Sequence, residues 1–196
     1  MKKHVLLIIA LLTSLNLFSQ KPHRSFGREF NKDTTKNELK LNLGTTIFGS
    51  YPEITYERVL DSDISIGAAL GFSLEDDLYP VNFAFTPYLR WFFGGSSENL
   101  PWFFGGSSQN LHKFGAGFFI EANGGILSKK NNEGYYENDI YGSRTKTELG
   151  AGLGVAIGWK HLSKNNWVGE IYFGGGRDFI NEGSYPRVGL TIGKRF

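Results

Sequence analysis

The sequence predicts an all-β fold, namely an eight-stranded antiparallel transmembrane β-barrel with up-and-down meander topology, preceded by a cleaved signal peptide. Alternation of period two, typical of strands, recurs from Glu38 to the end of the chain. One face of the alternating segments is apolar, whereas the other carries glycine and charged residues. Residues 1–20 have the composition of an export signal.

The composition argues against helices and against cysteine chemistry. The chain holds 26 glycines, and 15% of its residues are aromatic. Each glycine inside a helix costs about 1 kcal/mol relative to alanine, whereas closely packed strands with aromatic anchors tolerate it. The absence of cysteine from the sequence excludes a disulfide, a cysteine-ligated metal and the lipid anchor of a lipoprotein.

Residues 1–20 predict export across the inner membrane. Lys2 and Lys3 precede an apolar run, and small residues before Gln20 offer a cleavage site. A membrane-anchor helix is the alternative, but the run is shorter than the roughly 18 to 20 apolar residues that a span requires. Removal of two lysines from 21 basic residues leaves 19 against 19 acidic residues. This balance gives no support to nucleic-acid binding, and the polar residues 21–37 predict a flexible periplasmic lead-in.

The segment 148–160 shows the strand pattern most clearly. Leucine, valine, isoleucine and tryptophan occupy one face, whereas the other holds Glu148, Lys160 and mostly glycine. A face of glycines is expected where it points into a narrow lumen and leaves space for larger side chains opposite. The same pattern returns at 64–73 and 188–196, where Lys194 shares the apolar face close to the end of the chain and can extend toward the membrane boundary.

Eight such segments predict a barrel domain over residues 38–196. The predicted strands are 38–48, 52–60, 64–73, 81–93, 113–127, 147–161, 167–179 and 186–196. An even number of strands places both termini on one side, which we expect to be periplasmic, and lets the first strand pair with the last. Closure removes the open edge that lipid would not tolerate.

The faces predicted to point inward carry charges of both signs in equal number. They are Lys40, Glu53, Glu57, Arg90, Glu121, Glu148, Lys160, Glu170, Arg187 and Arg195. Side chains fill the interior of an eight-stranded barrel, so we expect paired charges to form a plug rather than an open channel. The alternative is an ordinary half-exposed sheet with solvated charges, which would require a second apolar layer that the sequence lacks.

Three features lie in the predicted connections. The longest outward loop, 128–146, interleaves Tyr135, Tyr136 and Tyr141 with acids and amides, which predicts a partner contact or, alternatively, a membrane rim. Residues 91–101 are repeated almost unchanged at 102–112, and we interpret this as a duplication that lengthened a periplasmic turn. The alternative is a binding element in which Trp102, the first residue of the second copy, contacts a partner. Glu75, Asp76, Asp77 and Asp139 offer oxygen ligands for calcium, but they lack the ligand spacing of an EF-hand.

Two parts of the sequence resemble known outer-membrane barrels. The alternating segment 185–196, which ends in the aromatic Phe196, is similar to the signal that the barrel assembly machinery recognises. The segments 38–46, 52–58 and 64–67 resemble a family of small bacterial outer-membrane barrels classed as domains of unknown function. The resemblance implies a fold and a location in the outer membrane and implies no activity.

We expect a non-enzymatic outer-membrane protein with a structural or accessory-subunit role, without a cofactor or a metal. Expected partners are outer-membrane lipid, the barrel assembly machinery and another outer-membrane protein. One alternative is a lipid-modifying enzyme, because the spacing of His161 and Ser163 is similar to the dyad of lipid A deacylases, which are also eight-stranded barrels. His161 is expected at the periplasmic end, away from that substrate. The other alternative is a small-solute pore.

Overall fold

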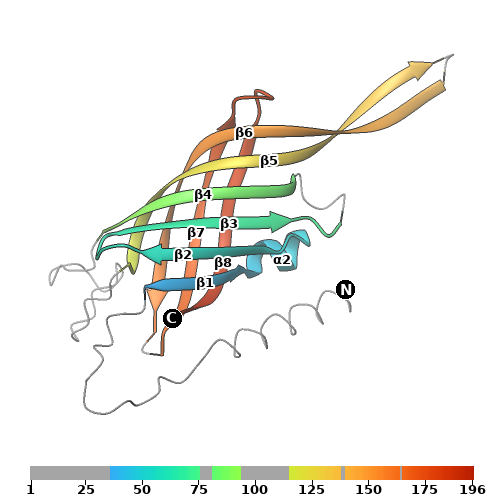
Figure 1. The fold of residues 1–196 in the computed structure, drawn as a ribbon. Coiled ribbons are helices and arrows are strands. Elements are labelled where there is room, and N and C mark those ends of the chain that lie inside the picture. The colour runs from blue at the N-terminus through green and yellow to red at the C-terminus, as the bar shows by residue number, and fades with distance from the viewer. Residues whose placement is uncertain (1–35, 76–80, 94–114, 138–139, 164) are drawn as a thin grey trace, which may run out of the picture.

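The chain folds into one closed antiparallel β-barrel, which confirms the predicted fold class (Figure 1). The computed structural model describes residues 36–75, 81–93, 115–137, 140–163 and 165–196, so the predicted signal peptide lies outside the described residues. The strands are β1 (Asn37–Asn42), β2 (Glu53–Val59), β3 (Ile64–Phe72), β4 (Val81–Phe93), β5 (Gly117–Glu137), β6 (Ile140–Leu162), β7 (Trp167–Asp178) and β8 (Ser184–Arg195). Each strand pairs with the next, and β8 pairs with β1.

The first and last strands meet at one end of the barrel. The Asn37 amide donates to the Phe196 carbonyl at 3.1 Å, and the Phe196 amide donates to the Asn37 carbonyl at 2.8 Å. We call this end the terminal end. The opposite end carries the connection between β5 and β6, and we call it the hairpin end.

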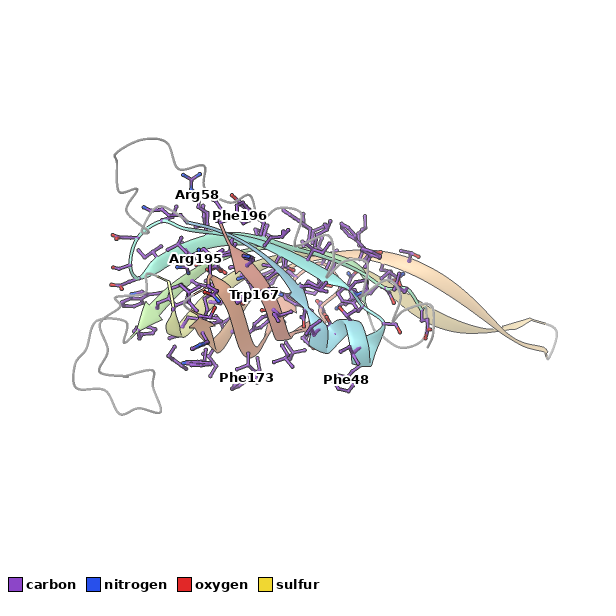
Figure 2. All side chains as sticks on the ribbon, turned by 90° about the horizontal axis from the view of Figure 1, so that it is seen from below. Phe48, Arg58, Trp167, Phe173, Arg195 and Phe196 are labelled. Atoms are coloured by element: carbon purple, nitrogen blue, oxygen red, sulfur yellow. The ribbon has the colours of Figure 1, made fainter. Side chains whose placement is uncertain are left out.

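Polarity is inverted relative to a water-soluble protein. Inward side chains such as Arg90 are fully buried, whereas Leu149, Leu153 and Phe173 on the outer face are more than 60% exposed. Phe48 and Phe173 point away from the barrel (Figure 2). An outer surface of large apolar side chains around a charged interior is the arrangement of a barrel that faces lipid.

In the described part of the chain, no helix has both the length and the apolar character of a membrane span.

The predicted first strand, 38–48, is wrong beyond Asn42. The chain leaves the barrel wall there and forms a short helix, α2 (Leu43–Gly49). The Asn42 side chain accepts a hydrogen bond from the Thr45 amide at 3.3 Å, and the Thr46 hydroxyl donates to the Asn42 carbonyl. Asparagine is among the best helix N-caps, and Ser50 ends the helix in a left-handed conformation (φ 47°).

Because β1 is short, half of β8 has no strand on that side. The pairing of β1 with β8 ends at Asn42 opposite Thr191, whereas β8 extends back to Ser184 and lies against α2. The Asn42 amide nitrogen donates to the Val188 carbonyl at 3.0 Å, and the Leu190 amide donates to the Asn42 side-chain oxygen at 3.2 Å. Alternation places Pro186 on this same edge, where its missing N–H leaves no donor unpaired.

The prediction of a loop over 128–146 is also wrong. The strands β5 and β6 continue past the barrel and pair with each other as far as Glu137 opposite Ile140. The pairing of β4 with β5 ends at Lys129, and that of β6 with β7 ends at Gly152. A two-stranded ribbon therefore projects from the hairpin end (Figure 1). Residues 130–146 lack the apolar alternation by which a strand with one buried face is recognised in a sequence.

We predict that Asn42→Ala lowers the free energy of unfolding by about 2 to 4 kcal/mol, because it removes the helix cap and leaves the backbone groups of Val188 and Leu190 without their partner. Urea unfolding of the detergent-folded protein measures this loss. Asn37→Ala is the matched control at the other end of β1, where the side chain accepts one exposed hydrogen bond from Tyr56 at 2.9 Å. Equal losses in the two variants would contradict the special role of Asn42.

Candidate functional site in the charged interior

Five carboxylates and five cations fill the interior of the barrel. All ten residues are buried, and the most exposed, Glu53, is only 7% exposed. They are Glu38, Glu53, Glu57, Glu121 and Glu170 together with Lys40, Arg90, Lys160, Arg187 and Arg195. The set is formally neutral, as burial away from water requires.

Two lysines bind three carboxylates in the half of the interior nearer the terminal end. The Lys160 ammonium lies 2.9 Å from Glu38, 2.5 Å from Glu57 and 3.2 Å from Glu170. The Lys40 ammonium lies 2.7 Å from Glu170 and 3.4 Å from Glu38, and it also pairs with Glu57. The three carboxylates have oxygens within 4.8 Å of one another, the spacing of a metal site. Both ammonium groups already supply the positive charge that a cation would bring.

Three arginines extend this cluster along the barrel. Arg90 donates to Glu57 at 2.7 Å and to Glu121 at 2.8 Å. Arg187 continues from Glu121 at 2.9 Å to Glu53 at 3.0 Å, toward the hairpin end. At the terminal end, Arg195 donates to Glu38 at 2.8 Å and to the Gly115 carbonyl at 3.1 Å. The ten side chains thus form one continuous network.

Tyrosines line this network and supply both hydroxyl donors and ring faces. The Tyr88 hydroxyl lies 3.0 Å from Glu57, and the Tyr172 hydroxyl lies 2.9 Å from Glu53. The Arg90 guanidinium lies 4.5 Å from the centre of the Tyr88 ring, and that of Arg187 lies 4.8 Å from the Tyr172 ring. The ring faces stabilise guanidinium nitrogens that hydrogen bonds do not fully saturate.

Glycines make room for these rings, as the sequence pattern predicted. Gly67 lies directly opposite Tyr88, and Gly158 and Gly189 lie opposite Tyr172 on its two neighbouring strands. A Cβ atom at any of the three would overlap a tyrosine ring or a neighbouring carbonyl. The tyrosine rings therefore fill the space that the glycines leave in the interior.

Apolar side chains close the interior above and below the charges. Tyr51, Val81, Ala84, Leu127 and Tyr185 form a buried cluster at the hairpin end. Val59, Leu162 and Val168 are buried near the terminal end. Between the hairpin-end cluster and Arg187 remains a cavity of about 20 Å³. That volume holds about one water molecule, so it does not amount to a channel.

Nine of the ten charged residues expected in the lumen lie in this network. The tenth, Glu148, is half-buried at the hairpin end, opposite Lys129 in register. Sequence reasoning missed Glu38, although its spacing of two from Lys40 places it on the same face. It also missed Asp178, which is buried, lies 3.6 Å from Lys129 and accepts hydrogen bonds from the turn at Ile180 and Asn181.

The residues expected to contact a partner are only partly described. The backbone places Tyr136 directly opposite Tyr141 and Tyr135 opposite Gly142 in the projecting ribbon. Trp102, all of the duplicated segment beyond Phe93, and the acidic residues Asp76, Asp77 and Asp139 lie outside the described residues. Phe196 follows the last strand and is half-exposed.

His161 and Ser163 have structural partners of their own. The His161 ring stacks on Trp159 on the outer face, with 5.6 Å between ring centres. The Ser163 hydroxyl oxygen accepts a hydrogen bond from the Trp167 amide at 3.0 Å in the turn before β7. Both lie at the terminal end of the barrel, the end where the sequence places them. Among the described residues, the contacts of His161 and Ser163 are with Trp159 and Trp167 rather than with each other.

No family model matches the chain, and no curated protein matches it, so the resemblance to a family of small outer-membrane barrels stays a prediction. Among solved structures, the chain is similar to the N-terminal β-barrel domain of Pseudomonas aeruginosa OprF. The match covers 83% of this chain and 96% of that chain, with 15% sequence identity and a TM-score of 0.45.

We predict that Glu57→Gln lowers the free energy of unfolding by about 3 to 5 kcal/mol, because it leaves the buried cations Lys40, Lys160 and Arg90 with one carboxylate fewer. Urea unfolding in detergent measures the change. Glu182→Gln, at an exposed turn of the hairpin end, is the control and should shift the midpoint little. An unchanged midpoint for Glu57→Gln would show that the network does not stabilise the barrel.

Proposed function

We propose that this protein is a non-enzymatic outer-membrane barrel that anchors the β5–β6 ribbon and presents it to a partner in the cell envelope. One observation carries the proposal: paired charges and apolar clusters fill the interior from end to end. A filled interior leaves the outer face and the projecting ribbon as the surfaces available for function.

The outer face supports a membrane location. Its exposed large side chains are apolar on strands from all sides of the barrel, for example Leu70, Leu89 and Leu190. Trp91, Trp159 and Trp167 lie near the terminal end, and the Lys194 ammonium lies 5.6 Å from the centre of the Trp167 ring. Aromatic residues with a lysine are typical of the boundary between lipid and water.

The connections support an orientation with the terminal end in the periplasm. Barrels of this type have short periplasmic turns and longer extracellular segments. The turns after β2 and β6 at the terminal end are short, although the connection after β4 at that end spans residues 94–116, and the ribbon and α2 lie at the hairpin end. With this orientation, the ribbon extends away from the cell.

The ribbon supports a binding role. Its strands continue for eight residues beyond Lys129, to Glu137, which corresponds to roughly 25 Å at the usual rise of a strand. An isolated two-stranded hairpin is only marginally stable in water, and its free edges offer backbone groups to another strand. Contact with a partner would supply the packing that the barrel does not.

We predict that a ribbonless variant folds but loses its partner. A two-residue Asn-Gly turn in place of residues 130–147 joins Lys129 to Glu148, which face each other in register. The folded barrel should still resist cold detergent and change gel mobility on boiling. Affinity purification from native outer membranes in mild detergent, followed by mass spectrometry, should show a stoichiometric companion with the wild-type protein and none with the variant.

Deletion of residues 102–112, which removes one copy of the duplicated segment, is the matched control and should retain the companion. If the companion protein is lost only with this deletion, its binding site lies in the connection between β4 and β5 rather than in the ribbon. Purification of the wild-type protein alone, or its recovery in the soluble periplasm, would contradict the proposal.

A small-solute pore is the alternative that the filled interior opposes. We predict no conductance steps when the wild-type protein is inserted into planar lipid bilayers, because no continuous aqueous path remains between the apolar clusters. A general porin inserted into the same bilayers provides the positive control. Reproducible steps from the wild-type protein would make the pore the better assignment.

A further inference from the structure

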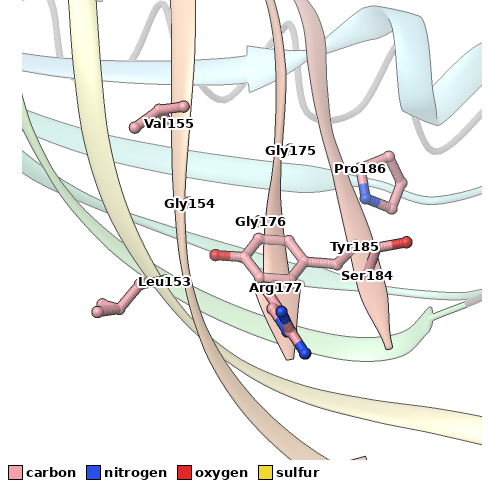
Figure 3. Close-up of a pocket in the computed structure, with 9 residues that line it drawn as sticks. All are labelled: Leu153, Gly154, Val155, Gly175, Gly176, Arg177, Ser184, Tyr185 and Pro186. Atoms are coloured by element: carbon pink, nitrogen blue, oxygen red, sulfur yellow. The ribbon is translucent and has the colours of Figure 1, made fainter. Parts of the chain in front are cut away.

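An open groove crosses the outer face near the hairpin end, where β6, β7 and β8 lie side by side (Figure 3). Its volume is about 720 Å³. Leu153 and Val155 of β6 form one side, Ser184 and Pro186 of β8 form the other, and Arg177 of β7 lies at one end. The lining is mainly apolar, with a single cationic side chain.

A missing side chain creates the groove. Alternation along β7 places Gly175 on the outer face between Phe173 and Arg177. Gly175 lies directly opposite Val155 on one neighbouring strand and opposite Pro186 on the other. A Cβ at Gly175 would approach only the Tyr185 carbonyl oxygen, at 3.2 Å. The outer face therefore has a depression at Gly175, and the side chains of the neighbouring strands form its two walls. We call this depression the trough.

The positive charge of Arg177 has no ion-pair partner among the described residues. The interior cations all form ion pairs, and Lys129 near the same end lies 3.6 Å from Asp178. Among the described residues, no carboxylate lies within salt-bridge distance of the exposed Arg177, which faces Leu153 across the strands. Arginine on the lipid face is costly near the membrane centre and tolerated near the interface, where lipid phosphates lie.

We propose that this groove binds a phosphorylated lipid of the outer leaflet, with an acyl chain along the trough over Gly175 and a phosphate on Arg177. The inference rests on the proposed outer-membrane location. The planar guanidinium offers two parallel N–H donors to phosphate oxygens, a stronger and more specific contact than a point charge. Leu153, Val155 and Pro186 supply the apolar walls for the chain.

Displacement of a fluorescent lipid A from the detergent-folded protein tests the site, with bis-phosphorylated and dephosphorylated lipid A as the two competitors. Arg177→Gln should weaken binding of the phosphorylated lipid at least about tenfold and leave the dephosphorylated lipid unchanged. Gly175→Leu fills the trough and should weaken binding of both lipids.

Two variants near the terminal end provide matched controls. Lys194→Gln removes another outward cation, and Gly169→Leu adds the same side chain to β7 where a Cβ meets nothing within 4 Å. Both should bind lipid A as the wild type does. If Arg177→Gln and Lys194→Gln weaken lipid A binding equally, the binding reflects non-specific electrostatic attraction, and the proposed site is wrong.

Two further outcomes bear on the source of the phosphate and on the location. Displacement of the labelled lipid by millimolar inorganic phosphate would indicate a free-anion site and overturn the lipid assignment. Cold-detergent resistance and membrane fractionation are measured on the same samples. If the wild-type protein inserts into membranes but Arg177→Gln binds lipid A as the wild type does, only the groove proposal is contradicted. If the wild-type protein is soluble, the proposed function itself is contradicted.

Discussion

The neutrality of the interior is the constraint on which the rest of the structure depends. Eight strands enclose a space that side chains fill, and a single unpaired charge there would cost several kcal/mol. Five carboxylates therefore face five cations, and each of these residues must occupy an inward-facing position of its strand. Tyrosines and their opposing glycines complete the filling, so strand register, glycine content and charge balance all serve the same requirement.

Local alternation made most of the barrel predictable. The segment from Leu149 to Trp159 shows both faces directly, and the parity of Lys160 and Glu170 led to the interior network. The helix α2 was not predictable in this way, because Leu39, Leu41 and Leu43 continue the alternation past Asn42. Only the tertiary position of Asn42, between the helix and the edge of β8, stops the strand there. The ribbon was missed because residues 130–146 do not alternate between apolar and polar side chains.

The division between a filled interior and a varied exterior bears on what such a barrel can do. The charged groups in the interior already form ion pairs with one another, so few of them are available to bind a substrate. Outside, the ribbon, the edge of β8 beside α2 and the trough at Gly175 each interrupt the apolar wall. All three lie at the hairpin end, and recognition by partner proteins or lipids is the kind of function they fit.

The shortness of β1 also bears on how the barrel closes. This strand pairs at five positions with each neighbour, whereas β5 pairs with β6 along its whole length, from Gly117 to Glu137. Its ion pair between Glu38 and Arg195 joins residues 157 positions apart in the chain. The entropy of closing such a loop must be overcome before any contact compensates for it. Closure therefore requires the last strand, and the two junctions of β1 are the shortest ladders in the barrel.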